Sequence, residues 1–367
     1  MIFKKNKYTS YFVALIILAS CSTTSNNLKL NSIDHFEETS QKESLEIYDY
    51  QSYFLNDLEK IQKAIDSDVL DPDQLRDAKL LKNNYQKIIS KKKYTIELKP
   101  NQKNSKEIIE LIYKSNLPVS IFWDEKKQIS LPKNLLSQKI DGFCSSLYDD
   151  AIESINEALN ESADSILVIY SQEYASFVEV LKLGNANLIS RKYDSSNFQE
   201  FSAEILGIKL SERRFKKISN LNPNQKLNFI PQPRSDLEQI VILLKPQDYK
   251  AMIPALRYHG GSRFQYLKFI SSLEDINTPL QLLDYEDSWT PISNYLTTKI
   301  KKDGSTSLER FLELGALNDW LIVHLLKQAG VQSAKVNGIT GSILYRSNSC
   351  AKRKIPLQKI SSDLFSS

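Results

Sequence analysis

The chain has 367 residues, of which 41% are hydrophobic and 25% charged, and this composition is typical of a folded globular protein and excludes disorder along the whole length. With 48 Lys and Arg against 44 Asp and Glu, the net charge of +4 is too small for the concentrated basic surface of a nucleic-acid-binding protein. Only 10 Gly, 3 His and 3 Cys are present, so the composition disfavours Gly-rich phosphate loops, His/Cys metal clusters and enzymes in general.

Residues 1–20 have the pattern of a secretory signal peptide. Three lysines among the first seven residues precede an uncharged apolar run over residues 11–20, which is shorter than the roughly 20 residues of a transmembrane helix. The run ends in Leu18-Ala19-Ser20-Cys21, a tetrapeptide that resembles the lipobox of bacterial lipoproteins. The resemblance implies cleavage before Cys21, attachment of acyl chains such as palmitate to it, and an outer-membrane anchor because Ser22 rather than Asp follows. An ordinary signal peptide with a chance cysteine is the alternative.

Residues 21–43 are polar and have no apolar period, so we expect them to tether the folded part to the membrane. Over residues 44–92, apolar residues recur at helical spacing in two stretches. Between these stretches lie Asp71 and Pro72, which are typical of a helix N-cap and first turn. We therefore predict a helical hairpin over residues 44–92, followed by one larger domain over residues 93–367.

The larger domain alternates strand-like and helix-like segments, which predicts an α/β fold with a mostly parallel sheet. Three continuous apolar runs, residues 117–123, 166–170 and 237–244, predict central strands buried on both faces. Further strands are predicted at 187–193 and 267–270, helices at 135–148, 174–183, 198–206, 211–220, 247–258 and 308–328, and a hairpin around the Asn-Gly pair at 337–338.

Two cysteines remain once Cys21 carries lipid. Export favours disulfides, but Cys144 and Cys350 are far apart in the sequence. We expect each to be a small buried apolar side chain. A bridge between the two is the alternative.

Five short blocks carry a more specific signal. They are QKIDGF at 138–143, SDLEQIVIL at 235–243, IPALRY at 253–258, VNGITG at 336–341 and RKIPL at 353–357. Together and in this order they resemble the LpoA/LppC family of outer-membrane lipoproteins. That family activates bifunctional penicillin-binding proteins, and its C-terminal domain has the type I periplasmic-binding-protein fold. The resemblance covers residues 117 to about 360.

Three departures from the family pattern concern the N-terminal half. Residues 124–127 read DEKK where the family has a small turn with glycine, and only residues 149–165 separate two predicted elements of the first lobe. The long helical-repeat domain of the family is reduced to one hairpin. The expected fold is therefore α/β, with a type I periplasmic-binding-protein-like body, a trimmed first lobe and a short helical hairpin before it. A trimmed lobe disfavours a cleft for a small ligand.

No catalytic set is apparent in the sequence. His35, His259 and His324 lie in separate segments, and no nucleophile elbow, H-E-x-x-H motif or paired-cysteine motif is present. We expect no catalysis, no cofactor and no metal. Carboxylates such as Asp284 are expected in a surface acidic loop. Because aromatic residues beside acids are common at interfaces, the candidate partner-contact residues are Trp289, Asp287 and Glu286.

These observations predict a lipid-anchored regulator on the periplasmic face of the outer membrane. The resemblance implies that it stimulates peptidoglycan synthesis by contacting a bifunctional penicillin-binding protein. The alternative is a solute-binding receptor lipoprotein for a small ligand of the amino acid or amide type. Nucleic acid is not an expected partner.

Overall fold

The computed structural model describes residues 58–360 except 68–69, 101–103, 116, 125–130, 160–164, 195–196, 222, 224–225, 270–280, 282–284, 294 and 296–306. The predicted signal peptide, Cys21 and the predicted tether lie outside the described residues. Everything described belongs to one compact unit, Tyr48–Ser367. Of the helices within the described ranges, none has both the length and the apolar character that crossing a bilayer requires.

The first elements are two helices, α3 (Leu58–Asp66) and α4 (Pro72–Ser90). The start of α4 is the predicted one: the Asp71 carboxylate accepts hydrogen bonds from the backbone N–H groups of Asp73 and Gln74. The Gln74 side chain accepts the Asp71 N–H in return, which completes a capping box. Asn84 of α4 donates to the backbone oxygen of Ser333, so the helix packs on the body.

A small α/β unit follows, formed by β1 (Tyr94–Leu98), α5 (Ser105–Ser115) and β2 (Val119–Trp123). Its two strands are parallel and form a two-stranded sheet of their own. The prediction that residues 117–123 form a central strand buried on both faces is therefore wrong. Phe122 and Trp123 are 48% and 50% exposed. The sequence analysis missed β1 and α5, because their alternating polar and apolar residues lack a continuous apolar run.

The main sheet has six strands in the order β11-β7-β6-β5-β3-β4. The strands are β3 (Ser165–Tyr170), β4 (Leu188–Lys192), β5 (Leu237–Leu243), β6 (Gln265–Lys268), β7 (Ser288–Pro291) and β11 (Leu357–Ile360). All pairs are parallel except β11 with β7. The predicted α/β class and the central position of β3 and β5 are confirmed, and the β1–β2 pair forms a separate small sheet.

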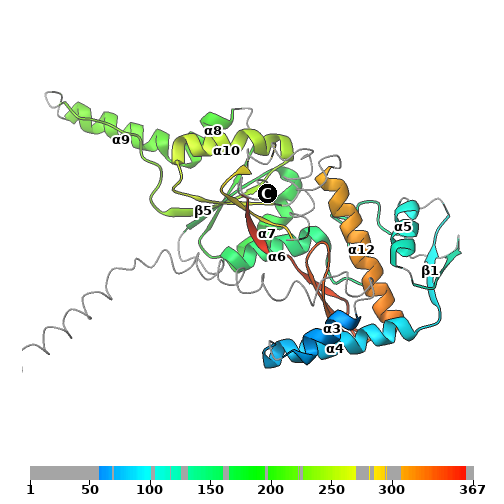
Figure 1. The fold of residues 1–367 in the computed structure, drawn as a ribbon. Helices are drawn as coiled ribbons and strands as arrows, with labels where there is room; N and C mark the ends of the chain where they lie inside the picture. Colours follow the sequence, from blue (N-terminus) through cyan, green and yellow to red (C-terminus); the bar gives the residue numbers. More distant parts are fainter. Residues whose placement is uncertain are drawn as a thin grey trace, which may run out of the picture. The chain divides into compact units, whose positions relative to one another are not determined.

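Helices cover both faces of the main sheet. Figure 1 shows α6 (Leu147–Leu159) and α7 (Ala175–Gly184) on one side, and α8 (Phe198–Ile205) and α10 (Pro246–Gly260) on the other. This arrangement explains why β3 and β5 have no solvated face: Val168 and Ile242 are fully buried.

The helix predicted over residues 135–148 is wrong, since α6 begins only at Leu147. Before it the chain makes a turn, in which the Asn134 side chain accepts hydrogen bonds from the N–H groups of Leu136 and Ser137. Gly142 then adopts φ +89°, a left-handed conformation that ends any helical path. The apolar residues of this segment are buried, as they would be in an amphipathic helix, but the backbone is not helical.

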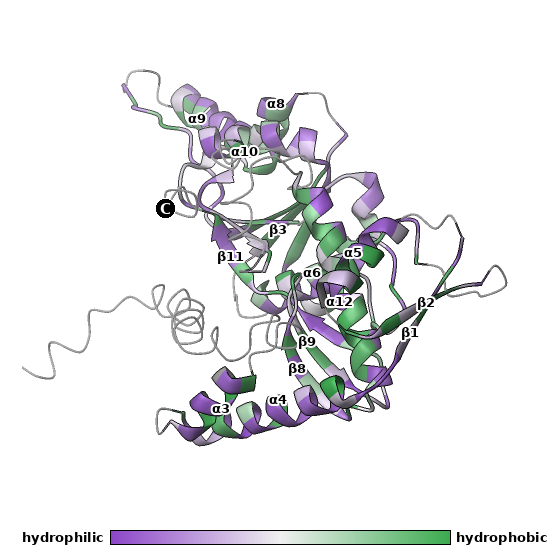
Figure 2. Ribbon diagram, turned by 45° about the vertical axis from the view of Figure 1, so that its right-hand side comes forward, coloured by the Kyte–Doolittle hydropathy of each residue, from purple (hydrophilic) through white to green (hydrophobic). Residues whose placement is uncertain are grey.

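The C-terminal elements join the two α/β parts. Helix α12 (Leu308–Gln328) matches the prediction and lies between the main sheet and the β1–α5–β2 unit (Figures 1 and 2). The strands β8 (Ser333–Asn337) and β9 (Ser342–Arg346) form the predicted hairpin, and β10 (Lys352–Lys354) adds a third strand to it. Figure 2 shows that apolar residues dominate α12, as expected for a helix enclosed by neighbours.

Cys144 and Cys350 form a disulfide, which corrects the expectation of two separate buried apolar side chains. Their Cα atoms are 5.0 Å apart although 206 residues separate them. The bridge Phe143–Ala351 lies directly beside the bond, so the strand-like segment after β9 brings Cys350 back to the turn before α6. Sequence distance was a poor guide here because β10 and β11 return the chain to the body.

Candidate functional site

The carboxyl edge of the main sheet is the position at which a ligand site is expected. In open α/β sheets a ligand binds outside the carboxyl ends of two strands where the strand order reverses. Here β3 is followed by β4 on one side and by β5 on the other, so the reversal lies between β3 and β5. The loops that follow these strands, at Ser171 and at Lys245, therefore define the candidate site.

An ion pair spans the reversal point. Lys245 Nζ lies 3.1 Å from Glu173 Oε2, and the Ser171 hydroxyl donates to Glu173 Oε1 at 3.3 Å. The Ser171 N–H donates to the backbone oxygen of Leu243, which joins the ends of the two strands. The polar groups at this edge thus pair with one another, while the Lys245 and Glu173 side chains stay exposed to solvent.

Aromatic side chains pack beside the ion pair. Phe269, which follows β6 and is fully buried, lies 4.9 Å from Tyr148, 5.3 Å from Tyr174 and 5.2 Å from Phe177, measured between ring centroids. These side chains come from three separate segments and form one cluster, named here the Phe269 cluster. It fills the carboxyl edge with apolar rings.

A buried cation lies at the end of β6. Lys268 is fully buried, and its Nζ lies 3.5 Å from the ring centroid of Tyr285 and 4.3 Å from that of Tyr249. The two rings stack 5.2 Å apart. Burial raises the pKa of the Tyr249 hydroxyl well above its usual value, so this phenol stays neutral beside the ammonium group. The lysine is enclosed by rings rather than presented to solvent.

The family-like block VNGITG has a structural role in the hairpin turn. Asp319 of α12 is fully buried and accepts the backbone N–H groups of Ile339 at 2.7 Å and Thr340 at 2.9 Å, as well as the Thr340 hydroxyl. A Cβ on Gly338 would lie 2.7 Å from the Asp319 carboxylate, so only glycine fits there. The sequence pattern does not show that the Asp319 carboxylate holds the backbone of this block.

The block RKIPL also belongs to the core. Arg353 Nη1 lies 2.9 Å from Asp150 Oδ2, and both side chains are almost completely buried. The Ser145 hydroxyl donates to the same carboxylate, and the guanidinium carbon lies 4.3 Å from the Phe143 ring centroid. Burial raises the pKa of Asp150 to about 6 against the lowering effect of Arg353. Two of the blocks that carry the family resemblance, VNGITG and RKIPL, thus make buried contacts that hold the fold together.

The predicted contact residues are not brought together on one surface. Trp289 is buried within β7, a strand that was not predicted and that lies between β6 and β11, which corrects its expected role as an exposed aromatic contact. The Asp287 carboxylate is exposed and lies 3.0 Å from Lys359 Nζ. Glu286 offers its backbone oxygen to Arg257. Asp284 lies outside the described residues.

The histidines are also apart. His259 Nε2 lies 3.2 Å from the backbone oxygen of Gln199. His324 stacks on Trp320 in α12, and burial lowers its pKa. His35 lies outside the described residues. Within the described ranges, His, Cys, Asp and Glu side chains form no group of three or more able to hold a metal ion.

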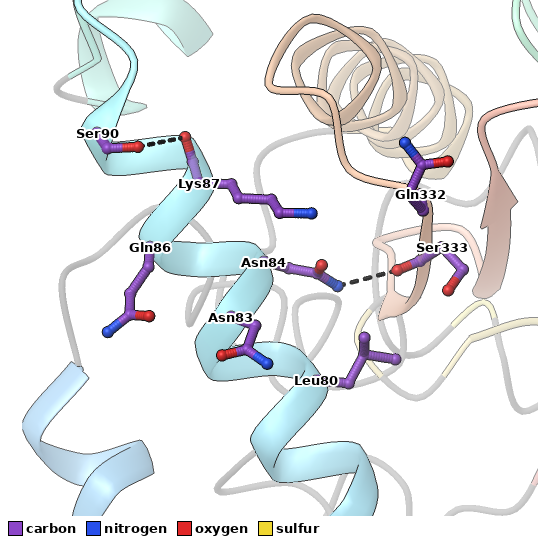
Figure 3. Close-up of a pocket in the computed structure, with 8 residues that line it drawn as sticks. All are labelled: Leu80, Asn83, Asn84, Gln86, Lys87, Ser90, Gln332 and Ser333. Atoms are coloured by element: carbon purple, nitrogen blue, oxygen red, sulfur yellow. Dashed lines mark hydrogen bonds between the residues drawn. The ribbon is translucent and has the colours of Figure 1, made fainter.

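One open groove lies between α4 and the start of β8, with a volume of about 500 Å³. Figure 3 shows carboxamide and lysine side chains around it, among them Asn83, Gln86, Lys87 and Gln332. Asn84 points across the groove to the Ser333 backbone oxygen. Its lining residues come from α4 and from residues 332–333 at the start of β8.

No family model matches this chain, and no curated protein matches it. The chain is similar in fold to two solved structures of Haemophilus influenzae LpoA. For one monoclinic form, the match covers 92% of this chain and 74% of the LpoA chain, with 14% sequence identity and a TM-score of 0.45. For full-length LpoA in another monoclinic form, the match covers 88% of this chain and 69% of the LpoA chain, with 13% sequence identity and a TM-score of 0.47. Both are structures of the family that the sequence blocks resemble, and at this identity the similarity concerns the fold.

Proposed function

We propose that this chain is a lipid-anchored, non-catalytic regulator that stimulates peptidoglycan synthesis by contacting a bifunctional penicillin-binding protein. The proposal starts from the lipobox-like tetrapeptide that ends in Cys21 and from the five ordered sequence blocks. The packing of Asp319 on VNGITG and of Asp150 on Arg353 gives two of these blocks a definite role in the fold, which supports the proposal.

The observation that carries the choice of mechanism is the aromatic packing at the sheet edge. A solute receptor needs an open polar crevice at the strand reversal. In this chain the Phe269 cluster packs beside that edge, and Glu173 there is already paired with Lys245. This supports a role through protein contact over the alternative role as a receptor for an amino acid or amide ligand.

The action on a synthase would be a shift of its conformational equilibrium. A regulator shifts such an equilibrium only by binding the active conformation more tightly than the inactive one. A tenfold difference in affinity corresponds to about 1.4 kcal/mol, which a modest contact surface supplies. An anchor in the outer membrane would present the folded body to a partner in the periplasm.

A reconstitution experiment tests the proposal. The purified mature chain should raise the glycosyltransferase or transpeptidase rate of a bifunctional penicillin-binding protein from the same bacterium, and should show no turnover of its own. Amino acids and muropeptides should leave its melting temperature unchanged. A ligand-dependent rise of several degrees, without any effect on a synthase, would replace the proposal with the solute receptor.

The anchor is tested separately. Labelled palmitate should enter the wild-type protein, and Cys21→Ser should abolish the labelling and release the protein from the membrane fraction. Membrane attachment of the wild type without label would contradict the lipobox interpretation.

A further inference from the structure

The helix α9 (Ile208–Leu221) is little buried for its length. Only Ile208 of its 14 residues is buried. Figure 1 shows the helix extending away from the sheet, with the segment after it running back alongside. We name residues 208–234 the arm.

The arm is a formed structure. Phe215 of α9 stacks on Phe229 of the returning segment with ring centroids 4.4 Å apart. At the base, the Arg234 N–H donates to the Leu206 backbone oxygen at 2.8 Å. The Gln232 N–H also reaches the Ser211 hydroxyl, at 3.4 Å. One side of α9 is thus occupied by its own return segment.

Most of the remaining surface of α9 is exposed, including Glu212, Lys216 and Asn220. At 3.6 residues per turn, positions i, i+3, i+4, i+7, i+8 and i+11 share one face of a helix. On α9 these positions are Leu210, Arg213, Arg214, Lys217, Ile218 and Leu221, and all six side chains are exposed. We name this set the arm face.

Its charge is strongly one-sided. The helix carries five cationic side chains and one acidic one, hence a net charge of +4 on a chain whose total is also +4. Within the described residues, Lys209 is the one cation of α9 that pairs with a carboxylate, that of Glu200 at 2.6 Å. The three cations of the arm face lie at its centre, and its apolar residues lie at the two ends.

This distribution selects the kind of partner. A helix that lies on a bilayer has a continuous apolar stripe with cations along its borders. The arm face has the reverse order, with cations in the middle and apolar anchors spaced eight and eleven residues apart. Such spacing suits a protein groove that receives a helix, with an acidic floor and apolar pockets at its ends.

We infer that the arm face is the surface by which this chain docks into an acidic groove of a partner protein. The inference rests on the proposed function in taking that partner to be the bifunctional penicillin-binding protein, and it names the residues that make the contact.

The test uses the full mature chain and the purified synthase. Arg213→Glu, Arg214→Glu and Lys217→Glu together should weaken binding at least tenfold, and increasing salt should weaken binding of the wild type but hardly that of the variant. A matched control reverses three exposed lysines elsewhere, Lys79, Lys106 and Lys352, and should change the affinity less than twofold. Should the glutamates disturb the helix, the same three positions changed to Gln should still weaken binding. Equal binding of the arm variant and the wild type overturns the inference.

If the wild type does not bind the synthase at all, the proposed function is contradicted. A second measurement then tests the arm face as a docking surface independently of the synthase. A photo-crosslinking residue is placed in cells at Ile218, which is 55% exposed, or at Leu183 of α7, which is 91% exposed. An adduct from position 218 alone, mapped to an acidic segment of an identified protein and lost upon the triple charge reversal, supports the arm face as a docking surface. Lipid adducts only, no adduct, or equal adducts from both positions overturn it.

Discussion

The strands β2 and β3 have similar apolar sequences, VSIFW and SILVIY, and both pair in parallel, yet they lie in very different surroundings. The strand β3 has a neighbour on each side and helices on both faces of its sheet, and its four central residues are buried. The strand β2 pairs with β1 alone, and its last two side chains are half exposed. The comparison teaches that an apolar run predicts a strand, whereas the number of neighbouring elements decides how deeply that strand is buried.

The largest difference is expected from a charge placed in each strand. Val168→Asp in β3 buries a carboxylate without a partner and should cost at least about 3–5 kcal/mol of unfolding free energy. Trp123→Asp in β2 should cost only about 1–2 kcal/mol, since half of this side chain is already in water. Urea denaturation measures both. Equal losses would contradict the contrast between the two sheets.

A smaller effect is expected at the helix between the two sheets. Asp319→Ala leaves the N–H groups of Ile339 and Thr340 without their acceptor and should cost about 2–4 kcal/mol. Glu309→Ala, on an exposed position of the same helix, should change the stability by less than about 0.5 kcal/mol. If the two variants are equally stable, Asp319 does not hold the hairpin turn.

The disulfide should matter for one region only. Changing Cys144 and Cys350 together to Ser should cost about 2–4 kcal/mol, because the cross-link restricts the unfolded chain. Faster amide hydrogen exchange is expected around residues 142–151 and 347–354, with unchanged exchange over β1, α5 and β2. Faster exchange in the β1–α5–β2 unit as well would show that the two regions unfold together.

The smallest effect is a dependence on pH. Burial raises the pKa of Asp150 from 3.8 to about 6 in the folded chain, so the folded state binds a proton more tightly than the unfolded state. The contribution of Asp150 to stability should therefore increase as the pH falls through about 6 and be fully present below about 4.

Thermal or urea unfolding between pH 4 and 7 measures this contribution. The difference in unfolding free energy between wild type and Asp150→Asn should grow by about 1–3 kcal/mol from pH 7 to pH 4. The comparison with the variant removes the similar influence of Asp319, whose pKa burial also raises. A difference that is constant with pH would contradict the raised pKa.

Local signals in the sequence predicted much of the fold. The Asp71 cap, the buried runs of β3 and β5, the helix α12 and the Asn-Gly hairpin all depend on a few adjacent residues, and each was found. The turn before α6 could not be predicted, because its apolar residues are buried by partners elsewhere in the chain. The disulfide likewise depends on the bridge between Phe143 and Ala351, and Trp289 lies in β7, which pairs with β11; both pairings join residues far apart in the sequence.

The candidate site was harder to predict than the fold. The Glu173–Lys245 pair joins two loops that only the strand order brings together, and the Phe269 cluster combines rings from three segments. The arm face was within reach of the sequence, since residues 211–220 were predicted to form a helix. Its exposure was not predictable. A projecting helix and a helix packed on a sheet can have the same spacing of apolar residues and differ only in their tertiary contacts.

The bond between Cys144 and Cys350 also orders events in time. In an exported chain, Cys144 reaches the oxidising compartment while Cys350 is still 206 residues behind it. During this interval its thiol is open to reaction with any other thiol or disulfide nearby, and strands β3 to β9 all emerge within it. The correct partner arrives only when β9 has folded onto β8 and turned back towards Phe143. Formation of this bond is therefore a late step of maturation in an exported chain. A pulse-chase assay of its oxidation would report when the segment around Cys350 has packed beside Phe143.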